Sequence, residues 1–172
     1  MIIIFRLATD KDFNNIFNLY KECTRDLNKR GIIQWNENYP TKELIKDNID
    51  KRHQFVYIEN DNLVGTFVLS EVEDEYWQKI NWVEDNFIGL HLLAISPEYQ
   101  NKGHGKKVID YCEKYAKDKN YKSIHLDVFS KNKGALKLYK NRGYKKIGDL
   151  IFEFKPKDNQ LYYCYEKVLK DD

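Results

Sequence analysis

The segment GLHLLAISPEYQNKGHGKK, residues 89–107, contains the clearest structural signal in this chain. It opens with a short apolar run typical of a buried strand, and Pro97 ends that strand because proline cannot donate to a ladder. In the polar loop that follows, Gly103 and Gly105 allow unusual backbone dihedrals and the close approach of a ligand. The segment therefore predicts a strand, a loop and a helix in succession.

The predicted helix begins near Lys106 and carries its apolar residues on one face. These residues are Val108, Ile109, Cys112, Tyr115 and Ala116. The positive N-terminal end of the helix points back at the glycine loop, whose N–H groups can converge on an anion. A P-loop would need a hydroxyl residue after the lysine, and a dinucleotide fingerprint would need a third glycine where Val108 stands. Neither nucleotide motif fits this loop.

Two motifs resemble those of a known enzyme superfamily. Residues 100–105, Gln-Asn-Lys-Gly-His-Gly, resemble the coenzyme A motif [QR]-x-x-G-x-[GA] of the GNAT N-acetyltransferases. Residues 132–144 are similar to the second GNAT motif, N-x-x-A-x-x-L-Y-x-x-x-G-[FY]. With both motifs at the right separation, the chain is identified as a member of the GNAT superfamily. The resemblance implies acetyl-CoA as co-substrate and an amine as its partner substrate.

Length, charge and cysteine content set limits on the function. The 172 residues are enough for one core, so we expect a single domain over residues 1–172. The 29 Lys and Arg residues nearly balance the 27 Asp and Glu residues, which predicts neither nucleic acid nor membrane as partner. Three cysteines without C-x-x-C spacing favour a reduced, cytoplasmic protein, and no metal site is expected. Residues 1–5 are apolar but too short for a signal peptide.

The remaining pattern predicts an α/β fold with a mixed central sheet and helices on both faces. Caps at Thr9, Thr41 and Ser130 predict helix starts, and Gly143 is expected just after a helix end. Outside the central strand, strands are expected at residues 2–8, 54–59, 63–70, 123–128, 144–154 and 160–169. Residues 71–86 are interpreted as an insertion, and the element order resembles that of the GNAT fold.

The resemblance assigns coenzyme binding to the loop and to the strand before it. The loop residues are Gln100, Asn101, Lys102, Gly103, His104, Gly105 and Lys106. The strand residues, whose backbone N–H groups would polarise the thioester carbonyl, are Leu93, Ala94 and Ile95. Asn132 resembles the family's asparagine that contacts the pantetheine arm. The alternative is that Gly103 only caps a helix, the lysines form a solvated face, and Asn132 is a polar residue of a first helical turn.

Three residues are candidates for proton transfer. Tyr139 matches the family tyrosine that lies at the coenzyme and protonates the leaving thiolate, a role that suits a phenol because its pKa is close to that of a thiol. The alternative for Tyr139 is a buried aromatic on an amphipathic helix. His91 resembles a histidine of the arylalkylamine branch that passes the amine proton on, and Asp127 resembles the glutamate base of ribosomal-protein N-terminal acetyltransferases. The sequence leaves the choice between His91 and Asp127 open.

Since no cysteine falls in either motif, we expect direct transfer in a ternary complex without a covalent intermediate. The alternatives are a coenzyme A sensor without transfer activity and a protein N-terminal or lysine acetyltransferase. A homodimer is an expectation from relatives alone. The insertion 71–86 has a local charge of six acids against one lysine, −6 + 1 = −5, and carries three aromatic residues. It predicts a cationic amine as acceptor, unless the aromatic residues tuck onto the core.

Overall fold

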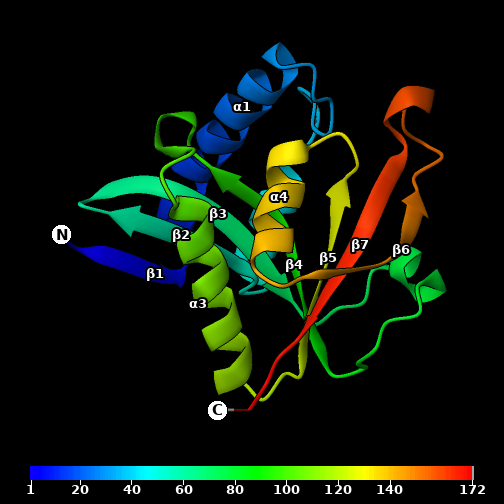
Figure 1. The fold of residues 1–172 in the computed structure, drawn as a ribbon. Coiled ribbons are helices and arrows are strands. Elements are labelled where there is room, and N and C mark those ends of the chain that lie inside the picture. Colours follow the sequence, from blue (N-terminus) through cyan, green and yellow to red (C-terminus); the bar gives the residue numbers. More distant parts are fainter. Residues whose placement is uncertain (172) are drawn as a thin grey trace. The chain divides into compact units, whose positions relative to one another are not determined.

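The structure, a computed structural model, describes residues 1–171, so the last residue of the expected domain lies outside the described residues. The described residues form a mixed seven-stranded sheet with strand order β1-β2-β3-β4-β5-β7-β6 (Figure 1). The strands are β1 Ile3–Leu7, β2 Gln54–Glu59, β3 Asn62–Ser70, β4 Phe87–Ile95, β5 Ser123–Phe129, β6 Lys145–Ile151 and β7 Leu161–Val168. The α-helices are α1 Phe13–Lys29, α2 Lys42–Asp50, α3 His104–Asp118 and α4 Lys133–Asn141. The predicted α/β class is confirmed.

The chain divides into two compact units, which are described separately. The first unit contains Met1–Leu69 and Leu92–Val108, and the second contains Ser70–His91 and the chain from Ile109 onward. Strand β4 and helix α3 each contribute residues to both units. Across residues 1–171, no helix is long and apolar enough to cross a membrane.

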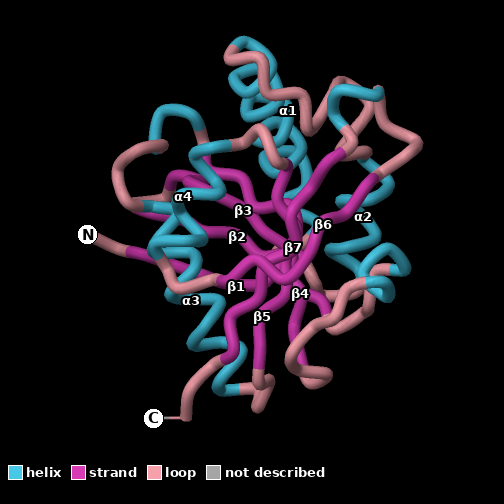
Figure 2. Tube along the Cα trace, turned by 45° about the vertical axis from the view of Figure 1, so that its right-hand side comes forward, coloured by secondary structure: helices cyan, strands magenta, loops and turns pink. Residues whose placement is uncertain are grey.

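In the first unit, β1 pairs antiparallel with β2, and β2 with β3. Figure 2 shows these three strands side by side. The turn between β2 and β3 places Asn60 and Asp61 at φ 50° and 66°, the left-handed conformation of a tight hairpin turn. Helix α1 buries one stripe, including Ile16, Tyr20 and Cys23, because these side chains recur at helical spacing. The stripe joins the core of this unit with residues of α2, β2 and β4.

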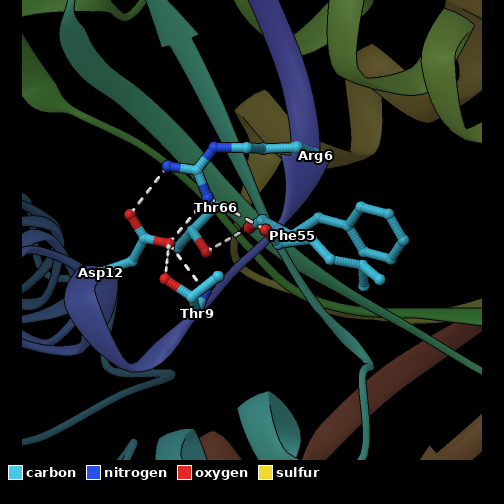
Figure 3. A network of polar contacts seen from close by, with 6 residues as sticks. Arg6, Thr9, Asp12, Phe55 and Thr66 are labelled. Carbon is cyan, nitrogen blue, oxygen red and sulfur yellow. Dashed lines mark hydrogen bonds and ion pairs between the residues drawn. The ribbon is translucent and has the colours of Figure 1, made fainter.

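The start of α1 is fixed by a small polar network, shown in Figure 3. A short 3₁₀ turn, Asp10–Asp12, precedes the helix, and the backbone N–H of Thr9 donates to Asp12 Oδ2 at 2.8 Å. Arg6 binds both carboxylate oxygens of Asp12, at 2.8 and 3.0 Å, and this hydrogen bonding lowers the pKa of Asp12. The predicted cap at Thr9 begins only this 3₁₀ turn, whereas α1 itself begins at Phe13 with Asp12 as its N-cap, later than predicted.

In the second unit, β5 pairs antiparallel with β7 and β7 with β6. The first part of β4 runs parallel to β5 from Phe87 paired with Ser123 to Gly89 paired with His125. The register between these two strands stops there, although β4 continues to Ile95 and β5 to Phe129.

A buried carboxyl group anchors the insertion to the sheet of the second unit. Glu166 on β7 accepts hydrogen bonds from the backbone N–H groups of Val83 and Glu84, at 2.7 and 3.1 Å. It also accepts from Ser123 Oγ at 2.7 Å and from His125 Nε2 at 2.9 Å. Glu166 is only 2% exposed, so each of these donors replaces water that the carboxyl group lost on folding.

The aromatic residues of the insertion face inward. Trp77, in the short 3₁₀ helix η2 (Glu75–Lys79), is fully buried, and Trp82 stacks on the ring of His125 with centroids 4.0 Å apart. Tyr76 packs against Phe152 with centroids 4.9 Å apart. The alternative that the aromatic residues tuck onto the core is therefore the correct one. Trp77 has no exposed indole face to offer a cation.

Two further helix starts differ from the prediction. Helix α4 is capped by Asn132 and not by Ser130, because the Asn132 side chain accepts a hydrogen bond from the N–H of Ala135 at 3.1 Å. Helix α3 begins at His104, two residues before the predicted start at Lys106. The predicted helix end is confirmed, since Gly143 follows the C-cap with φ 86°.

Removing the Glu166 side chain should unfold the second unit more easily. We expect Glu166→Ala to lower the free energy of unfolding by about 3 to 5 kcal/mol, because four donors, two of them buried, lose their acceptor. The control is Glu153→Ala at an exposed position, which should stay within about 0.5 kcal/mol of wild type. Urea unfolding measures both variants. Equal stability of the two variants would contradict this role of Glu166.

Candidate active site

In the first unit, the end of β4 leaves regular strand geometry. Leu92 has φ 52°, a left-handed conformation that is rare for a leucine. Beside it, β3 comes very close, because a Cβ at Gly65 would lie 2.8 Å from Ile95 Cδ1 and 2.9 Å from the carbonyl oxygen of Ala94. Glycine at position 65 is therefore needed for this approach. Residues Leu93–Ile95, predicted to polarise the thioester, follow directly after the irregular residue.

Side chains hold the backbone of this segment in place. Tyr20 Oη, from α1, donates to the carbonyl oxygen of Leu92 at 2.7 Å. Gln100 Nε2 and Cys23 Sγ both donate to the carbonyl oxygen of Ile95, at 2.9 and 3.2 Å. Gln100, assigned to the coenzyme by resemblance, thus also fixes the end of β4. Tyr20 was missed by the sequence analysis, since its only signal there is a place in the apolar stripe of a helix.

The glycine loop leads into the N-terminus of α3. Asn101 and Gly103 have φ values of 60° and 85°, and both residues are exposed. Lys102 Nζ donates to the carbonyl oxygen of Glu98 at 2.8 Å, while Lys106 is exposed at the first turn of the helix. Exposed N–H groups at a helix start with lysines beside them suit a phosphate group. The residues present therefore fit the pyrophosphate of coenzyme A.

His104 points into the first unit. It is buried, and its Nδ1 lies 2.9 Å from Tyr57 Oη, which donates to Glu59 Oε2 at 2.6 Å. Lys107 Nζ approaches the same Glu59 oxygen at 3.5 Å. The side chain of His104 thus ties the start of α3 to β2, and only its backbone remains for the proposed contact with the coenzyme. Tyr57 and Glu59 have no motif that could have revealed this role.

In the second unit, the candidate base Asp127 has a raised pKa. It lies on β5, and Trp77 Nε1 donates to its Oδ2 at 2.8 Å. Burial raises the pKa of Asp127 to about 6, and the hydrogen bond from Trp77 opposes this change. A carboxyl group of this kind can accept a proton near neutral pH.

His91 lies on the same tryptophan. Its ring stacks on Trp77 with centroids 4.8 Å apart and an angle of 14° between the planes. A Cβ at Gly89 would come within 2.7 Å of His91 Nε2 and 3.1 Å of the Trp77 ring, so a side chain there would displace both. Trp77 therefore contacts both candidate bases, His91 and Asp127. No sequence motif marked Trp77 for this position.

Tyr139 and Asn132 belong to α4 in the same unit. Tyr139 is buried and packs edge-on against Tyr144, with ring centroids 5.6 Å apart. Burial raises the pKa of Tyr139 well above its ordinary value, so its phenol keeps its proton at neutral pH. The site residues from the sequence thus fall into two groups. Leu93–Ile95 and the glycine loop belong to the first unit, whereas His91, Asp127, Asn132 and Tyr139 belong to the second.

Within residues 1–171, no group of three or more His, Cys, Asp or Glu side chains is arranged to hold a metal ion.

The sequence model of the Acetyltransferase (GNAT) family matches residues 13–144, which include both motifs. This chain belongs to the GNAT family. It is an N-acetyltransferase, and enzymes of this family generally use acetyl-CoA as co-substrate.

Similar proteins that match nearly the whole length of this chain support the family assignment. YesJ of Bacillus subtilis (strain 168), described as an uncharacterized N-acetyltransferase, is 26% identical over 94% of this chain and 88% of its own. An S-alkylcysteine N-acetyltransferase of the same organism is 25% identical over 96% of this chain and 89% of its own. The crystal structure of a GNAT acetyltransferase from Streptococcus agalactiae 2603 matches with a TM-score of 0.84 at 22% identity, covering 98% and 96% of the two chains. This structure shows the same fold.

Substitutions at Asn132 should separate its two roles. We expect Asn132→Ala to destabilise the acetyltransferase by about 1 kcal/mol, whereas Asn132→Asp keeps the cap and the stability. If the amide also contacts the pantetheine arm, both variants should raise the KM for acetyl-CoA, because both lose the N–H donor. Lys137→Ala, exposed on the same helix, is the control. An unchanged KM in Asn132→Asp would leave capping as the role of this residue.

Proposed function

We propose that this acetyltransferase moves the acetyl group of acetyl-CoA directly to the primary amine of a small molecule. In this proposal, the β4–α3 loop binds the coenzyme, Asp127 takes the amine proton and Tyr139 gives a proton to the thiolate. The observation that carries it is the Asp127 carboxyl group, held by Trp77, with a pKa raised to about 6 by burial. Such a group is mostly ionised at neutral pH, yet basic enough to accept a proton.

The proposed step balances without a covalent enzyme intermediate. The amine nitrogen attacks the thioester carbonyl carbon, the new C–N bond forms, and the C–S bond breaks. One proton passes from the amine to Asp127 and another from Tyr139 to the departing sulfur. Cys23, Cys112 and Cys164 are buried, and burial raises the pKa of each thiol, so none is a ready nucleophile. Buried, unbridged cysteines also support the proposal of a reducing, cytoplasmic environment.

A primary amine on a small molecule is the acceptor that we favour. The S-alkylcysteine N-acetyltransferase among the relatives supports a small-molecule acceptor over a protein terminus. A cationic amine is the second candidate, because Glu71, Glu73, Glu75 and Asp85 of the insertion are exposed. Thiol release from acetyl-CoA with a panel of amines tests the proposed function. Coenzyme binding without thiol release for any amine would favour the sensor alternative.

Tyr139→Phe tests the proton donor. Because the change removes one hydroxyl group and little packing, we expect kcat to fall by about 10²- to 10⁴-fold. Acetyl-CoA should still raise the melting temperature of the variant as it does for the wild type. Tyr163→Phe, on β7, is a matched control that should keep its activity. A wild-type kcat in Tyr139→Phe would show that Tyr139 has only a structural role.

The pH dependence of rate distinguishes Asp127 from His91. If Asp127 is the base, activity rises with pH through about 6, and Asp127→Asn removes this limb while His91→Gln keeps it. The opposite pattern would make His91 the base.

Asp127→Asn should also change stability in a pH-dependent way. The folded-state pKa of about 6 lies above the ordinary value of 3.8, so ionisation destabilises the folded protein. This cost is absent below about pH 4 and is fully present above about pH 6. We therefore expect Asp127→Asn to raise the free energy of unfolding by up to about 3 kcal/mol at pH 7 and by much less at pH 4. Urea unfolding at the two pH values measures the difference, and a pH-independent change would contradict a raised pKa.

A further inference from the structure

Trp77 joins the insertion 71–86 to the two candidate bases of the second unit. Its indole N–H donates to Asp127 Oδ2 at 2.8 Å, and its ring stacks on His91 with centroids 4.8 Å apart. The side chain is fully buried, and Gly89 makes room for it, since a Cβ there would lie 3.1 Å from two ring atoms. A buried indole N–H needs an acceptor and a buried carboxyl group needs a donor, so this hydrogen bond satisfies both groups.

The insertion fixes the indole from both sides along the chain. The backbone N–H of Trp77 donates to the carbonyl oxygen of Asp74 at 2.9 Å. Trp82 Nε1 donates to the carbonyl oxygen of Trp77 at 3.1 Å, and Glu166 accepts from the next two backbone N–H groups. These hydrogen bonds hold the indole N–H in its place at Asp127.

The hydrogen bond from Trp77 opposes the effect of burial on Asp127. Burial raises the pKa of this carboxyl group, and the indole N–H lowers it because it binds the ionised form. The charge of Asp74 raises the pKa and that of Lys155 lowers it, but Trp77 lowers it more than Lys155 does. The indole N–H is therefore the main group that keeps Asp127 ionised near neutral pH.

Two further titratable groups interact with Asp127 and are uncharged at neutral pH. Cys164 lies opposite Asp127 in the pairing of β5 with β7, and Tyr139 belongs to α4. Burial raises the pKa of both groups, and the charge of Asp127 raises it further, so each keeps its proton. Neither group therefore replaces Trp77 as a partner of the ionised carboxylate.

We propose that Trp77 is a positioning residue for acetyl transfer, which holds the Asp127 carboxylate ready to take the amine proton and so ties the insertion to the reaction. This inference rests on the proposed role of Asp127 as the base. Because Oδ2 already accepts the indole N–H, the amine proton goes to Oδ1. Trp77 acts through Asp127 and exchanges no proton itself.

Trp77→Phe keeps an aromatic ring beside His91 and removes the N–H. The pKa of Asp127 should then rise, and the rising limb of the pH–rate profile should move up by about one pH unit. With one acceptor amine, kcat/KM relative to wild type should be about tenfold lower at pH 5.5 and should recover to within about threefold at pH 8.5. Because the acceptor is the same in both proteins, the ionisation of the amine cancels from this ratio.

Trp82→Phe is the matched control. It is the same substitution in the same insertion, but the N–H that it removes donates to the backbone of Trp77 and not to Asp127. We expect its limb to stay at the wild-type pH, even if the variant is less stable. An unmoved limb in Trp77→Phe, an equal loss of rate at every pH, or equal shifts in both variants would overturn the inference.

A measurement on the wild-type protein needs neither turnover nor a substitution of the buried indole. With ¹⁵N-labelled tryptophan, the Nε1–H resonance of Trp77 should shift through about pH 6, because the charge of its acceptor changes there. The chain has three tryptophans, so loss of the other two resonances in Trp35→Phe and Trp82→Phe identifies it. Asp127→Asn should abolish the shift, and His91→Gln should keep it.

The inference and the proposed function fail in different ways. If the protein acetylates amines but the Trp77 resonance does not titrate, or titrates with His91, only the inference is overturned. If the resonance titrates with Asp127 but no amine releases thiol from acetyl-CoA, the proposed function is overturned.

Discussion

Buried backbone carbonyls must find donors, and this constraint shapes the end of β4. Leu92 adopts a left-handed conformation within the strand, and carbonyl oxygens of Leu92 and Ile95 accept hydrogen bonds from side chains. Tyr20 from α1 and Gln100 from the glycine loop supply the missing donors. One helix and one loop are thereby fixed against the segment Leu93–Ile95. The same hydrogen bonds that satisfy the backbone also set the positions of the parts proposed to bind acetyl-CoA.

In the second unit, a buried carboxyl group accepts hydrogen bonds from several segments of the chain. Glu166 collects four donors, two of them from the backbone of the insertion, so the insertion is fastened to the sheet. With the insertion in place, Trp77 reaches Asp127 and His91. A segment that looks like a charged surface loop in the sequence thus supplies the tryptophan that orients both candidate bases. Most of its acidic residues are exposed, while Trp77 is part of the core and Tyr76 and Trp82 are half-buried.

Stability and the proposed chemistry oppose each other at Asp127. A carboxyl group with a pKa raised by burial costs folding free energy whenever it is ionised. The hydrogen bond from Trp77 recovers part of that cost and leaves a group that can exchange a proton near neutral pH.

The sequence by itself determined the α/β class, the family, the start of α2 after Thr41 and the end of α4 before Gly143, because these depend on local rules. Proline ends a strand, Gly143 supplies a positive φ, and apolar spacing marks a helix face. Only the tertiary structure decided which distant side chains meet. Tyr20 and Leu92 are 72 residues apart, and Trp77 and Asp127 are 50 apart, so no local pattern connects them. The sequence also could not show which way the aromatic residues of the insertion point, since the same composition suits an exposed loop or a buried one. The hydrogen bonds that the backbone N–H groups of Val83 and Glu84 donate to Glu166 fix the path of the insertion.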